Sequence, residues 1–526
     1  MSHSSKDFGS LLLVNGSIYS GTPWRTPVSA LAIKDGKIVA QGDDARALHN
    51  EYQPGQIIDL KERVVLPGFI DSHIHLTSLG ESLTQLAFDE TSSVDQIQKK
   101  VASEVANKQP GEWIIGGKWL RHNLGGFPDK QFLDQVAPDN PVALHSKDLH
   151  SLLVNSKALQ ELGITSETPD PEGGRILKDE AGEPTGLLQE NAMELFEQGR
   201  PAIDYSKFRH FQDIAAEHCH QYGITAVHSI EPFEHWRLYD RLKKDARLNM
   251  RVGCLIYREK LDEVIDNNLH SGAGDDWLWT IGIKIFTDGA LGSASAWMKE
   301  PYENSDDRGM PLIEENELTS IIKKCHDHNL SVGIHAIGDA AVQMTLKTLN
   351  KDRVDSLYDR IEHFQVVDPQ DLELIPDDFI AAVQPIHLLG DREPADRLWG
   401  ERARNAYAFQ SLEKHRAILS FGSDAPVESV NPWEAIQAAV ERRKSADENP
   451  WYPGEKISLE NALSAYTGTN GRVAYREHKI GSLAVGAFGD AIVWNQNPWE
   501  ISSIELKSVR PVMTILNGNL VYADGA

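Results

Sequence analysis

The chain has 526 residues and a formal net charge of −26, with 52 lysines and arginines against 78 aspartates and glutamates. The acidic residues are spread along the chain, which argues against nucleic acid or an anionic membrane as a partner, and no apolar run approaches the roughly 20 residues of a membrane span. The three cysteines, Cys219, Cys254 and Cys325, are too scattered for a disulfide framework. We therefore expect buried thiols in a reducing compartment, the cytoplasm.

Short alternating strands with glycine turns are expected at both ends of the chain, over residues 10–65 and again over 480–524. Neither end has enough strands to bury a core alone. We therefore predict one small β-sandwich that is built from residues 1–64 together with residues 475–526.

Between these ends, over residues 65–474, apolar strand-like runs alternate with helical stretches, the pattern of a parallel α/β domain. Candidate strands lie near residues 66, 142, 224, 252, 282, 332, 361, 381 and 418. A (β/α)8 barrel, the TIM fold, needs one strand fewer, so at least one of them belongs to an insertion. Residues 77–222 are too long for one βα unit, and we expect them to form that insertion as a large loop over the barrel mouth.

Side chains that can bind a metal stand at the ends of five of the apolar segments. They are His73 with His75, Lys284, His335, His363 and Asp424. In a TIM barrel the active site is built from the C-terminal ends of the strands, so we expect these side chains to meet. His73 and His75 are two apart on a predicted strand, so they point to the same face and can share one ion.

Two further His-x-His pairs, His218 with His220 and His326 with His328, lie in stretches with a helical pattern. Residues two apart on a helix point away from each other. We interpret both pairs as surface histidines that take no part in metal binding.

Lys284 lies inside an apolar strand, where a cation is costly unless it is paired or loses its charge. The residue alone leaves two alternatives open, either an anionic carbamate that bridges two metal ions, or a lysine that reaches solvent or pairs with Asp288. His335 and His363, taken singly, are each compatible with a hydrogen-bonded core histidine as well as with a ligand. Asp424 can bind a metal, or it can cap the helix that follows it.

The order of these residues resembles the amidohydrolase superfamily of metal-dependent hydrolases. More narrowly, segments along nearly the whole chain resemble its YtcJ-like branch, the amidohydrolase 3 group. These segments are 65–75, 150–159, 182–186, 284–293, 384–388, 422–427 and 481–483. The resemblance implies a hydrolase of amide or related C–N bonds, often with two metal ions that are bridged by a carboxylated lysine, here Lys284.

From this ligand set we expect two divalent ions, zinc by ligand preference, with iron or manganese as open alternatives. The predicted reaction is the cleavage of a non-peptide C–N bond, in an amide, N-acyl or N-formyl compound, by a metal-activated hydroxide. Asp424 is the expected catalytic residue, since it can accept a proton and return it to the departing amine. A metal-dependent esterase or lactonase could use the same site. A non-catalytic binding scaffold is less favoured, because the chain keeps all six ligands.

Substrate-binding residues are expected beyond the strand ends, at His150, His387 and Arg402, which lie in family-like segments. Ordinary roles for a loop histidine or a surface arginine are the alternative. The expected partners are a small-molecule substrate and, as an open alternative, a second copy of the chain in a homodimer.

Overall fold

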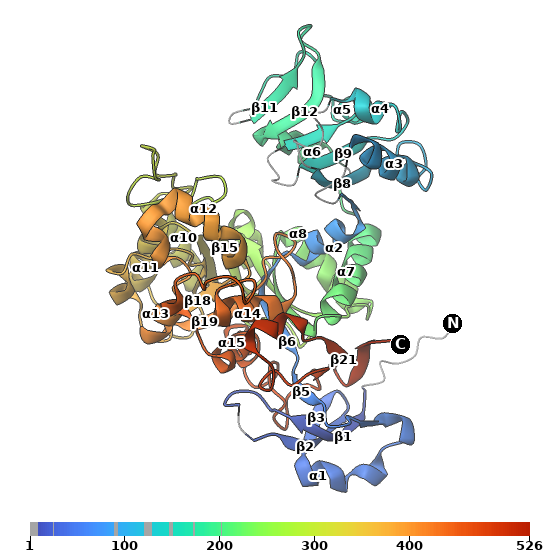
Figure 1. Ribbon diagram of the computed structural model, residues 1–526, viewed down its shortest axis with the longest axis vertical. Coiled ribbons are helices and arrows are strands. Elements are labelled where there is room, and N and C mark those ends of the chain that lie inside the picture. The colour runs from blue at the N-terminus through green and yellow to red at the C-terminus, as the bar shows by residue number, and fades with distance from the viewer. Residues whose placement is uncertain are drawn as a thin grey trace. The chain divides into compact units, whose positions relative to one another are not determined.

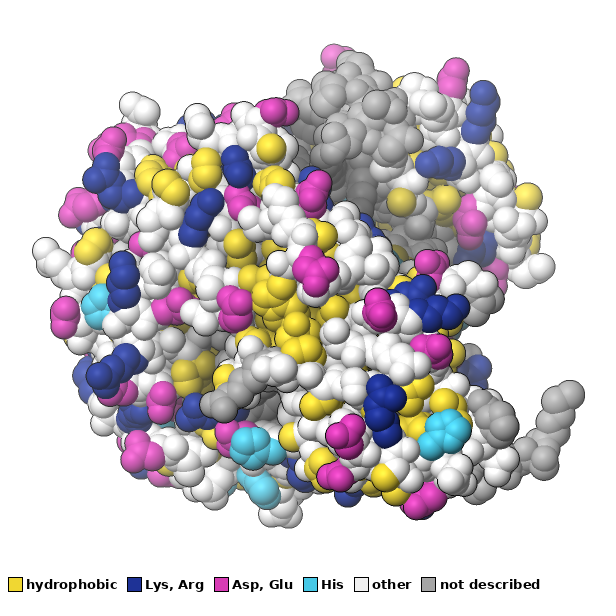
Figure 2. Space-filling model, turned by 60° about the horizontal axis from the view of Figure 1, so that its bottom comes forward, with side chains coloured by type: hydrophobic (Ala, Val, Ile, Leu, Met, Phe, Trp, Pro, Cys, Tyr) yellow, Lys and Arg dark blue, Asp and Glu magenta, His cyan; other side chains and the backbone are white. Residues whose placement is uncertain are grey.

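The computed structural model describes residues 9–24, 26–88, 93–119, 129–146, 151–171, 174–200 and 202–525. The chain divides into two compact units, one formed by Met1–Leu79 with Gln212–Ala526 and the other by Gly80–Phe211 (Figure 1). In the described part, no helix is long and apolar enough to cross a membrane. Figure 2 shows acidic and basic side chains interspersed over one face, so the negative charge is not gathered into one patch there.

Eight parallel strands of the first unit form one sheet in the order β6-β13-β14-β15-β16-β17-β18-β19. Their bounds are β6 Phe69–Ile74, β13 Ile224–Glu231, β14 Arg251–Tyr257, β15 Leu278–Phe286, β16 Ser331–Ala336, β17 Arg360–His363, β18 Ile380–Val383 and β19 Ile418–Phe421. These strands are buried almost throughout, as expected for a parallel sheet that is covered on both faces. The nearly closed sheet confirms the predicted α/β, TIM-like fold.

Helices follow most of the barrel strands (Figure 1). They are α7 Tyr205–His220, α8 Phe233–Lys244, α9 Leu261–Asp266, α10 Glu315–Asp327, α11 Asp339–Lys351, α12 His387–Trp399, α13 Phe409–Lys414, α14 Pro432–Glu441, α15 Leu459–Ala465 and α16 Gly468–Val473. Their amphipathic pattern explains the packing. In α11, for example, the residues that are buried recur at helical spacing.

The first and last barrel strands, β6 and β19, are joined by contacts at their ends and by a side chain from α16. The side-chain amide of Asn470 donates to the carbonyls of Ile70 and Phe421, at 2.7 and 2.9 Å. Beyond the strand ends, the backbone N–H of Asp424 donates to the carbonyl of His73 at 2.7 Å. These contacts close the barrel and bring together two segments that lie about 350 residues apart.

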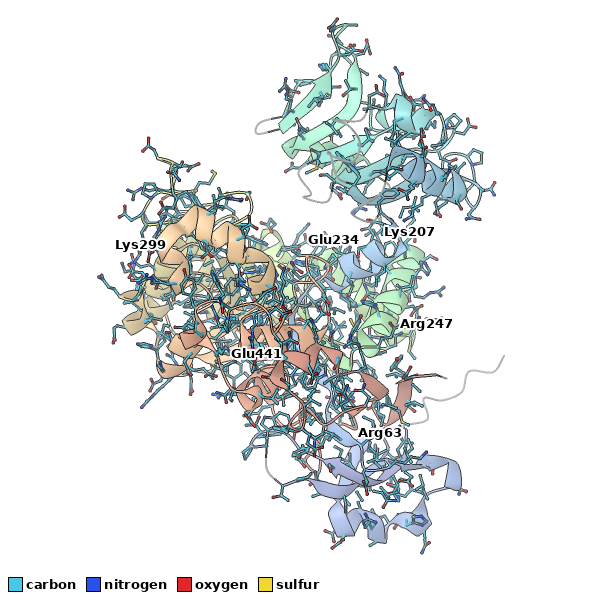
Figure 3. The ribbon with its side chains drawn as sticks, in the orientation of Figure 1. Arg63, Lys207, Glu234, Arg247, Lys299 and Glu441 are labelled. Carbon is cyan, nitrogen blue, oxygen red and sulfur yellow. The ribbon has the colours of Figure 1, made fainter. Side chains whose placement is uncertain are left out.

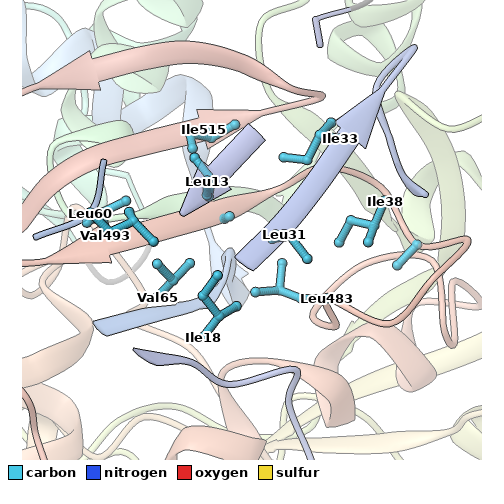
Figure 4. Close-up of a cluster of buried hydrophobic side chains, with 12 residues drawn as sticks. Leu13, Ile18, Leu31, Ile33, Ile38, Leu60, Val65, Leu483, Val493 and Ile515 are labelled. Atoms are coloured by element: carbon cyan, nitrogen blue, oxygen red, sulfur yellow. The ribbon is translucent and has the colours of Figure 1, made fainter. Parts of the chain in front are cut away.

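Strands from both ends of the chain form one eight-stranded sheet, in the order β22-β21-β20-β5-β1-β2-β3 with β4 beside β1. Their bounds are β1 Leu11–Ile18, β2 Val28–Lys34, β3 Lys37–Gln41, β4 Ile57–Asp59, β5 Val64–Pro67, β20 Ala491–Trp494, β21 Pro511–Leu516 and β22 Asn519–Ala523, and α1 spans Gly42–Ala47. Residues from both termini share one buried apolar cluster, including Leu31, Val65 and Val493 (Figure 4). The strands pair into a single sheet, so the predicted two-layered sandwich is not confirmed.

The strand that the sequence predicts near residue 66 belongs to this terminal sheet as β5, and the barrel begins later, at Phe69. Val65 pairs with Val493 of β20, whereas Phe69 pairs with Ile224 of β13. Gly68 lies at the change of sheet, and a Cβ there would lie 2.1 Å from Oγ1 of Thr225. One continuously buried segment, Val64 to Ile74, therefore serves two sheets in succession, which explains why the predicted boundary at residue 65 is a few residues too early.

The second unit contains a six-stranded sheet in the order β11-β12-β10-β9-β8-β7. The strands are β7 Leu86–Ala87, β8 Ile114–Trp119, β9 Val142–Ser146, β10 Ser151–Val154, β11 Gly174–Lys178 and β12 Pro184–Glu190. Helices α3 Val94–Val105, α4 Gln131–Asp134, α5 Ser156–Glu161 and α6 Glu194–Gly199 accompany them, and α2, Leu76–Thr84, leads into the unit. Leu144 and Ala143 of β9 belong to apolar clusters on opposite faces of the sheet. The insertion is thus a folded unit with its own core, and the expectation of a large loop is wrong.

Cys219, Cys254 and Cys325 are buried and unpaired, as the sequence predicts. The cytoplasmic location and the homodimer stay predictions, because neither is tested by the fold.

Candidate metal centre

Three predicted ligands converge where the first and last barrel strands meet. Nε2 of His73 and Nε2 of His75 each lie 3.4 Å from Oδ1 of Asp424. One ligand atom from each residue lies within 4.8 Å of the others. Two donors that bind one tetrahedral ion at roughly 2.0–2.1 Å stand about 3.4 Å apart, so this spacing fits a divalent metal better than it fits direct hydrogen bonds.

The backbone is strained at two of the predicted ligands. Asp424 has φ 59° and His363 has φ 71°, and Phe364 follows with φ 43°. A left-handed conformation of a non-glycine residue costs about 1–3 kcal/mol and persists where the surroundings hold it in place. Here the hydrogen bond from the N–H of Asp424 to His73 contributes to that restraint. Strain that coincides with two candidate ligands supports a functional role for this end of the barrel.

His335 and His363 form a second group beside the first. Their ring centroids lie 4.5 Å apart, and the ring of His363 lies 5.0 Å from that of His73. Burial, together with the neighbouring His335 and His73, holds the pKa of His363 well below its usual range. The imidazole is therefore neutral, which is the form that binds a metal.

Lys284 points into the same cluster and has no conventional partner. Its side chain is 1 % exposed, and Nζ has no hydrogen-bond partner among the described residues. Asp288 is engaged elsewhere, since its Oδ1 lies 3.1 Å from Nδ1 of His335. Burial lowers the pKa of Lys284 to about 8, although the negative charges of Glu362 and Asp424 oppose the shift. The alternatives of a lysine in solvent or paired with Asp288 are therefore wrong.

The carboxylates that orient the histidines were missed in the sequence. Oε2 of Glu362 accepts a hydrogen bond from Nδ1 of His73 at 2.6 Å, and its Oε1 forms a 2.6 Å ion pair with Nε of Arg360. Asp288 holds Nδ1 of His335 in the same way. Metal-binding histidines commonly use one ring nitrogen for such a carboxylate and the other for the metal. The signal was present in Glu362, an acid inside a short buried strand and directly before the candidate ligand His363, just as Lys284 is a base inside a buried strand.

The negative charge of Glu362 persists despite its burial. Burial alone would raise the pKa of this carboxyl, but the charges of Arg360 and His73 lower it well below its usual range. Asp424 behaves in the same way: burial raises its pKa, but His73, His75 and His363 together lower it well below the usual value. Both carboxylates are thus ionised at neutral pH and balance the positive charge that a metal would bring.

Of the three predicted substrate-binding residues, His387 lies at the cluster. It begins α12, and its Nε2 lies 3.5 Å from Oδ2 of Asp424, on the opposite oxygen from His73. Its ring centroid lies 6.2 Å from that of His363. His150 lies outside the described residues.

Arg402 is engaged with backbone carbonyls. Its guanidinium donates to the carbonyls of Trp399, Glu300 and Pro301, at 3.2, 2.7 and 2.5 Å. The last two belong to the segment that follows β15, where Lys299, labelled in Figure 3, is a second anchor. Its Nζ bonds to the carboxylates of Asp368 and Asp371. These contacts favour a role for Arg402 in holding this segment over a role in binding substrate.

The other His-x-His pairs include two buried histidines, so their description as surface residues is wrong in part. His220 bonds to the carbonyls of Ile224 and Asn249, both at 3.0 Å, and Nε2 of His326 lies 3.0 Å from a carboxylate oxygen of Asp359. His328, two residues on, is exposed. Each pair still diverges as helical geometry requires, and the described residues place neither pair in a possible metal site.

The chain is similar to known proteins over nearly its whole length. The model of the Amidohydrolase family matches residues 56–522. Protein LONG AFTER FAR-RED 3 of Arabidopsis thaliana is 34% identical over 97% of this chain and 91% of its own length. The putative amidohydrolase YtcJ of Bacillus subtilis (strain 168) is 32% identical over 96% of this chain and 98% of its own. An N-substituted formamide deformylase of Arthrobacter pascens is 23% identical over 97% of this chain and 98% of its own length. An uncharacterized metal-dependent hydrolase from Pyrococcus furiosus has a similar structure, with a TM-score of 0.80 and 29% identity over 93% of this chain and 100% of that one.

Proposed function

Because the chain belongs to the amidohydrolase family, we propose that it hydrolyses a non-peptide C–N bond of a small molecule, in an amide, N-acyl or N-formyl compound, at a centre of divalent metal ions. The observation that carries this proposal is the convergence of His73, His75 and Asp424 at spacings that suit one ion. The formamide deformylase among the relatives supports a C–N bond as the target.

We assign His73, His75 and Asp424 to a first ion and His335 with His363 to a second. A divalent ion bound there supplies a Lewis acid, which lowers the pKa of water and polarises a carbonyl group. Nitrogen and oxygen donors suit zinc, and they also suit iron or manganese.

Lys284 is the proposed bridge between the two ions. With a pKa of about 8, about half of its amine is neutral near pH 8, and a neutral amine can add to carbon dioxide. Its nitrogen forms the new bond to carbon and releases one proton, which leaves an anionic carbamate. The buried side chain would then carry a negative charge that bound divalent ions can neutralise, which would account for its burial without a hydrogen-bond partner among the described residues.

Asp424 is the proposed proton carrier. Its carboxylate is ionised, so it can take a proton from the attacking water and return it to the nitrogen of the departing amine. His387 stands at the other carboxylate oxygen of Asp424, 3.5 Å away, where it can hold the substrate in place for this transfer.

The test is an assay of the purified chain on a panel of N-formyl and N-acyl amines beside matched esters and dipeptides. We expect hydrolysis of the amides, about two equivalents of metal per chain, loss of activity on chelation and recovery when zinc is restored. Preference for the esters would support the esterase alternative. Full activity in metal-free protein would refute the proposal.

A further inference from the structure

Two aromatic side chains stand at the ends of neighbouring barrel strands, just beyond Lys284. Phe286 ends β15 and Tyr257 ends β14, and their ring centroids lie 6.2 Å apart. Phe286 is two residues beyond Lys284 on the same strand, so both side chains point to the same face of the sheet. We refer to Tyr257 and Phe286 as the aromatic shelf.

The shelf borders the candidate metal centre. The ring of Phe286 lies 5.3 Å from the ring of His335, and Nζ of Lys284 lies 5.1 Å from the centre of the Phe286 ring. Tyr257 is the register partner of Lys284 across the two strands. Burial and the negative charges of Glu231 and Asp424 raise the pKa of Tyr257, so its phenol stays neutral at any pH at which the enzyme would work.

Phe286 is 37 % exposed although the rest of β15 is buried. Among the described residues, eight large apolar side chains are exposed, and Leu312 and Val427 are two of the others. The N–H of Leu312 donates to the carbonyl of Thr287, next to Phe286, and the N–H of Val427 donates to that of Asp424.

An exposed aromatic ring at the end of a buried strand, in contact with a polar centre, differs from a single apolar side chain on an open surface. Exposure of apolar area to water is unfavourable, and an exposed apolar group beside a polar site often marks a binding surface. Small-molecule sites combine apolar and aromatic walls with a few polar groups that fix the reacting bond. The ring of Phe286 and the side chains of Lys284 and His335 meet that description.

We propose that the aromatic shelf binds an apolar substituent of the substrate, aromatic or branched alkyl, next to the scissile bond. The proposal rests on the proposed function, because it concerns the substrate of that same centre. The enzyme then prefers amides with such a group over analogues that carry a methyl or a carboxymethyl group in its place. The flat ring of Phe286 supplies the contact, and Tyr257 supports it from the neighbouring strand.

The first measurement is kcat/KM on the metal-loaded full chain with three formamides, which carry phenylethyl, methyl or carboxymethyl groups on nitrogen. A second set places phenylacetyl, acetyl or succinyl groups on a constant amine, so that the two sets distinguish the amine side from the acyl side. In at least one set we expect the aromatic compound to exceed the methyl compound by about tenfold or more. Equal rates in both sets would overturn the proposal.

The second measurement compares variants. Phe286→Ala should lower the aromatic-to-methyl ratio by about tenfold and change the methyl substrate by less than about threefold. Tyr257→Phe keeps the ring and should keep the ratio. Leu520→Ala, at an exposed apolar residue of the terminal sheet, is the matched control and should leave every rate unchanged. A fall of both substrates by the same factor in Phe286→Ala would show that Phe286 only supports Lys284 and His335, and would overturn the inference.

A third measurement does not need turnover and separates this inference from the proposed function. Calorimetry of metal-loaded protein compares phenylacetate with acetate for the acyl side, and phenylethylamine with methylamine for the amine side. In at least one pair the aromatic compound should bind about tenfold more tightly, and this advantage should be lost in Phe286→Ala. Absence of all amide hydrolysis with the binding advantage intact would refute the proposed reaction but not the shelf. Equal affinities within both pairs would refute the shelf but not the reaction.

Discussion

The carboxylate of Glu362 accepts a hydrogen bond from Nδ1 of His73 at 2.6 Å, while Nε2 of the same ring faces Oδ1 of Asp424 at 3.4 Å. The ring is therefore fixed between two carboxylates, one for each nitrogen. Arg360 pairs with the second oxygen of Glu362 and also donates to the backbone carbonyl of Ser72. This chain of contacts sets the tautomer of His73 and leaves Nε2 for a metal.

Glu362→Gln should weaken metal binding by about 10- to 100-fold, because it removes the charge that raises the basicity of His73. Zinc affinity is measured by competition with a coloured chelator. Glu373→Gln, at an exposed glutamate, is the control and should bind zinc as the wild type does. If the glutamine variant does not fold because Arg360 has lost its partner, Glu362→Asp is used instead, which keeps the charge but shortens the side chain that contacts His73 and should weaken zinc binding for that reason. Wild-type affinity in a folded variant would contradict the proposed role.

Lys284→Ala should lower kcat by more than about 100-fold and reduce the metal content, because two cations then stand close together with less negative charge between them. A small carboxylic acid such as propionate should restore part of the rate by filling the vacated space. Lys284→Arg should not recover activity, since a guanidinium stays cationic. Lys323→Ala, at an exposed lysine, serves as the control. Electron density for a bare amine at Lys284 with both metals fully occupied would rule out the bridge.

The meeting of the candidate ligands at one end of the barrel was predictable. The sequence places polar side chains directly after apolar runs, and the carboxyl ends of parallel barrel strands all lie at the same end of the barrel. His73, His75 and Asp424 meet for that reason. The contact between Glu362 and His73 was not predictable, since it joins β17 to β6, which are not neighbours in the sheet. Their distance depends on the curvature and closure of the barrel, and a periodic pattern carries no information about either.

The two parts of the fold that differ from expectation have a common cause. The residues from Val64 to Ile74 are buried throughout and lie in two strands with almost no residues between them, so the sequence does not reveal that β5 and β6 belong to different sheets. In the insertion, β9 is buried on both faces. A strand of that kind has the same apolar sequence pattern whether it belongs to a barrel or to another sheet. Sequence periodicity identifies a strand, whereas the partner of the strand is decided by tertiary packing.

His326 should contribute stability that depends on pH. Burial lowers the pKa of this histidine, but Asp359 and Asp352 outweigh burial and raise it above the usual value of 6.5. A raised folded pKa means that the stabilisation is complete below the unfolded pKa of about 6.5 and is lost as pH rises through the folded pKa. We therefore expect His326→Gln to lower the melting temperature most at pH 5–6, and less at higher pH.

The control for that prediction is His328→Gln, which changes an exposed side chain and should leave the melting temperature the same at every pH. Metal content should stay within about threefold of the wild type in both variants, since neither histidine lies at the candidate centre. A loss of metal in His326→Gln at constant stability would contradict the site proposed here.

Gly422 allows β19 to approach β6, and its replacement should disturb the metal centre without touching a ligand. A Cβ at this position would lie 2.4 Å from the backbone nitrogen of His73 and 2.6 Å from its Cβ. Backbone atoms cannot yield as the end of a flexible side chain can, so in Gly422→Ala the two strands must separate. Overpacking of this kind costs about 1–3 kcal/mol.

The movement also displaces Asp424 from His73 and His75, whose Nε2 atoms lie 3.4 Å from its carboxylate in the wild type. We expect a lower melting temperature in metal-free protein and, in addition, a zinc affinity reduced by about tenfold or more. Gly454→Ala is the matched control, because a Cβ there meets no atom within 4 Å. Wild-type zinc affinity in Gly422→Ala would show that the contact between the first and last strands does not set the geometry of the centre. The assignment of Asp424 to the ion held by His73 and His75 would then be wrong.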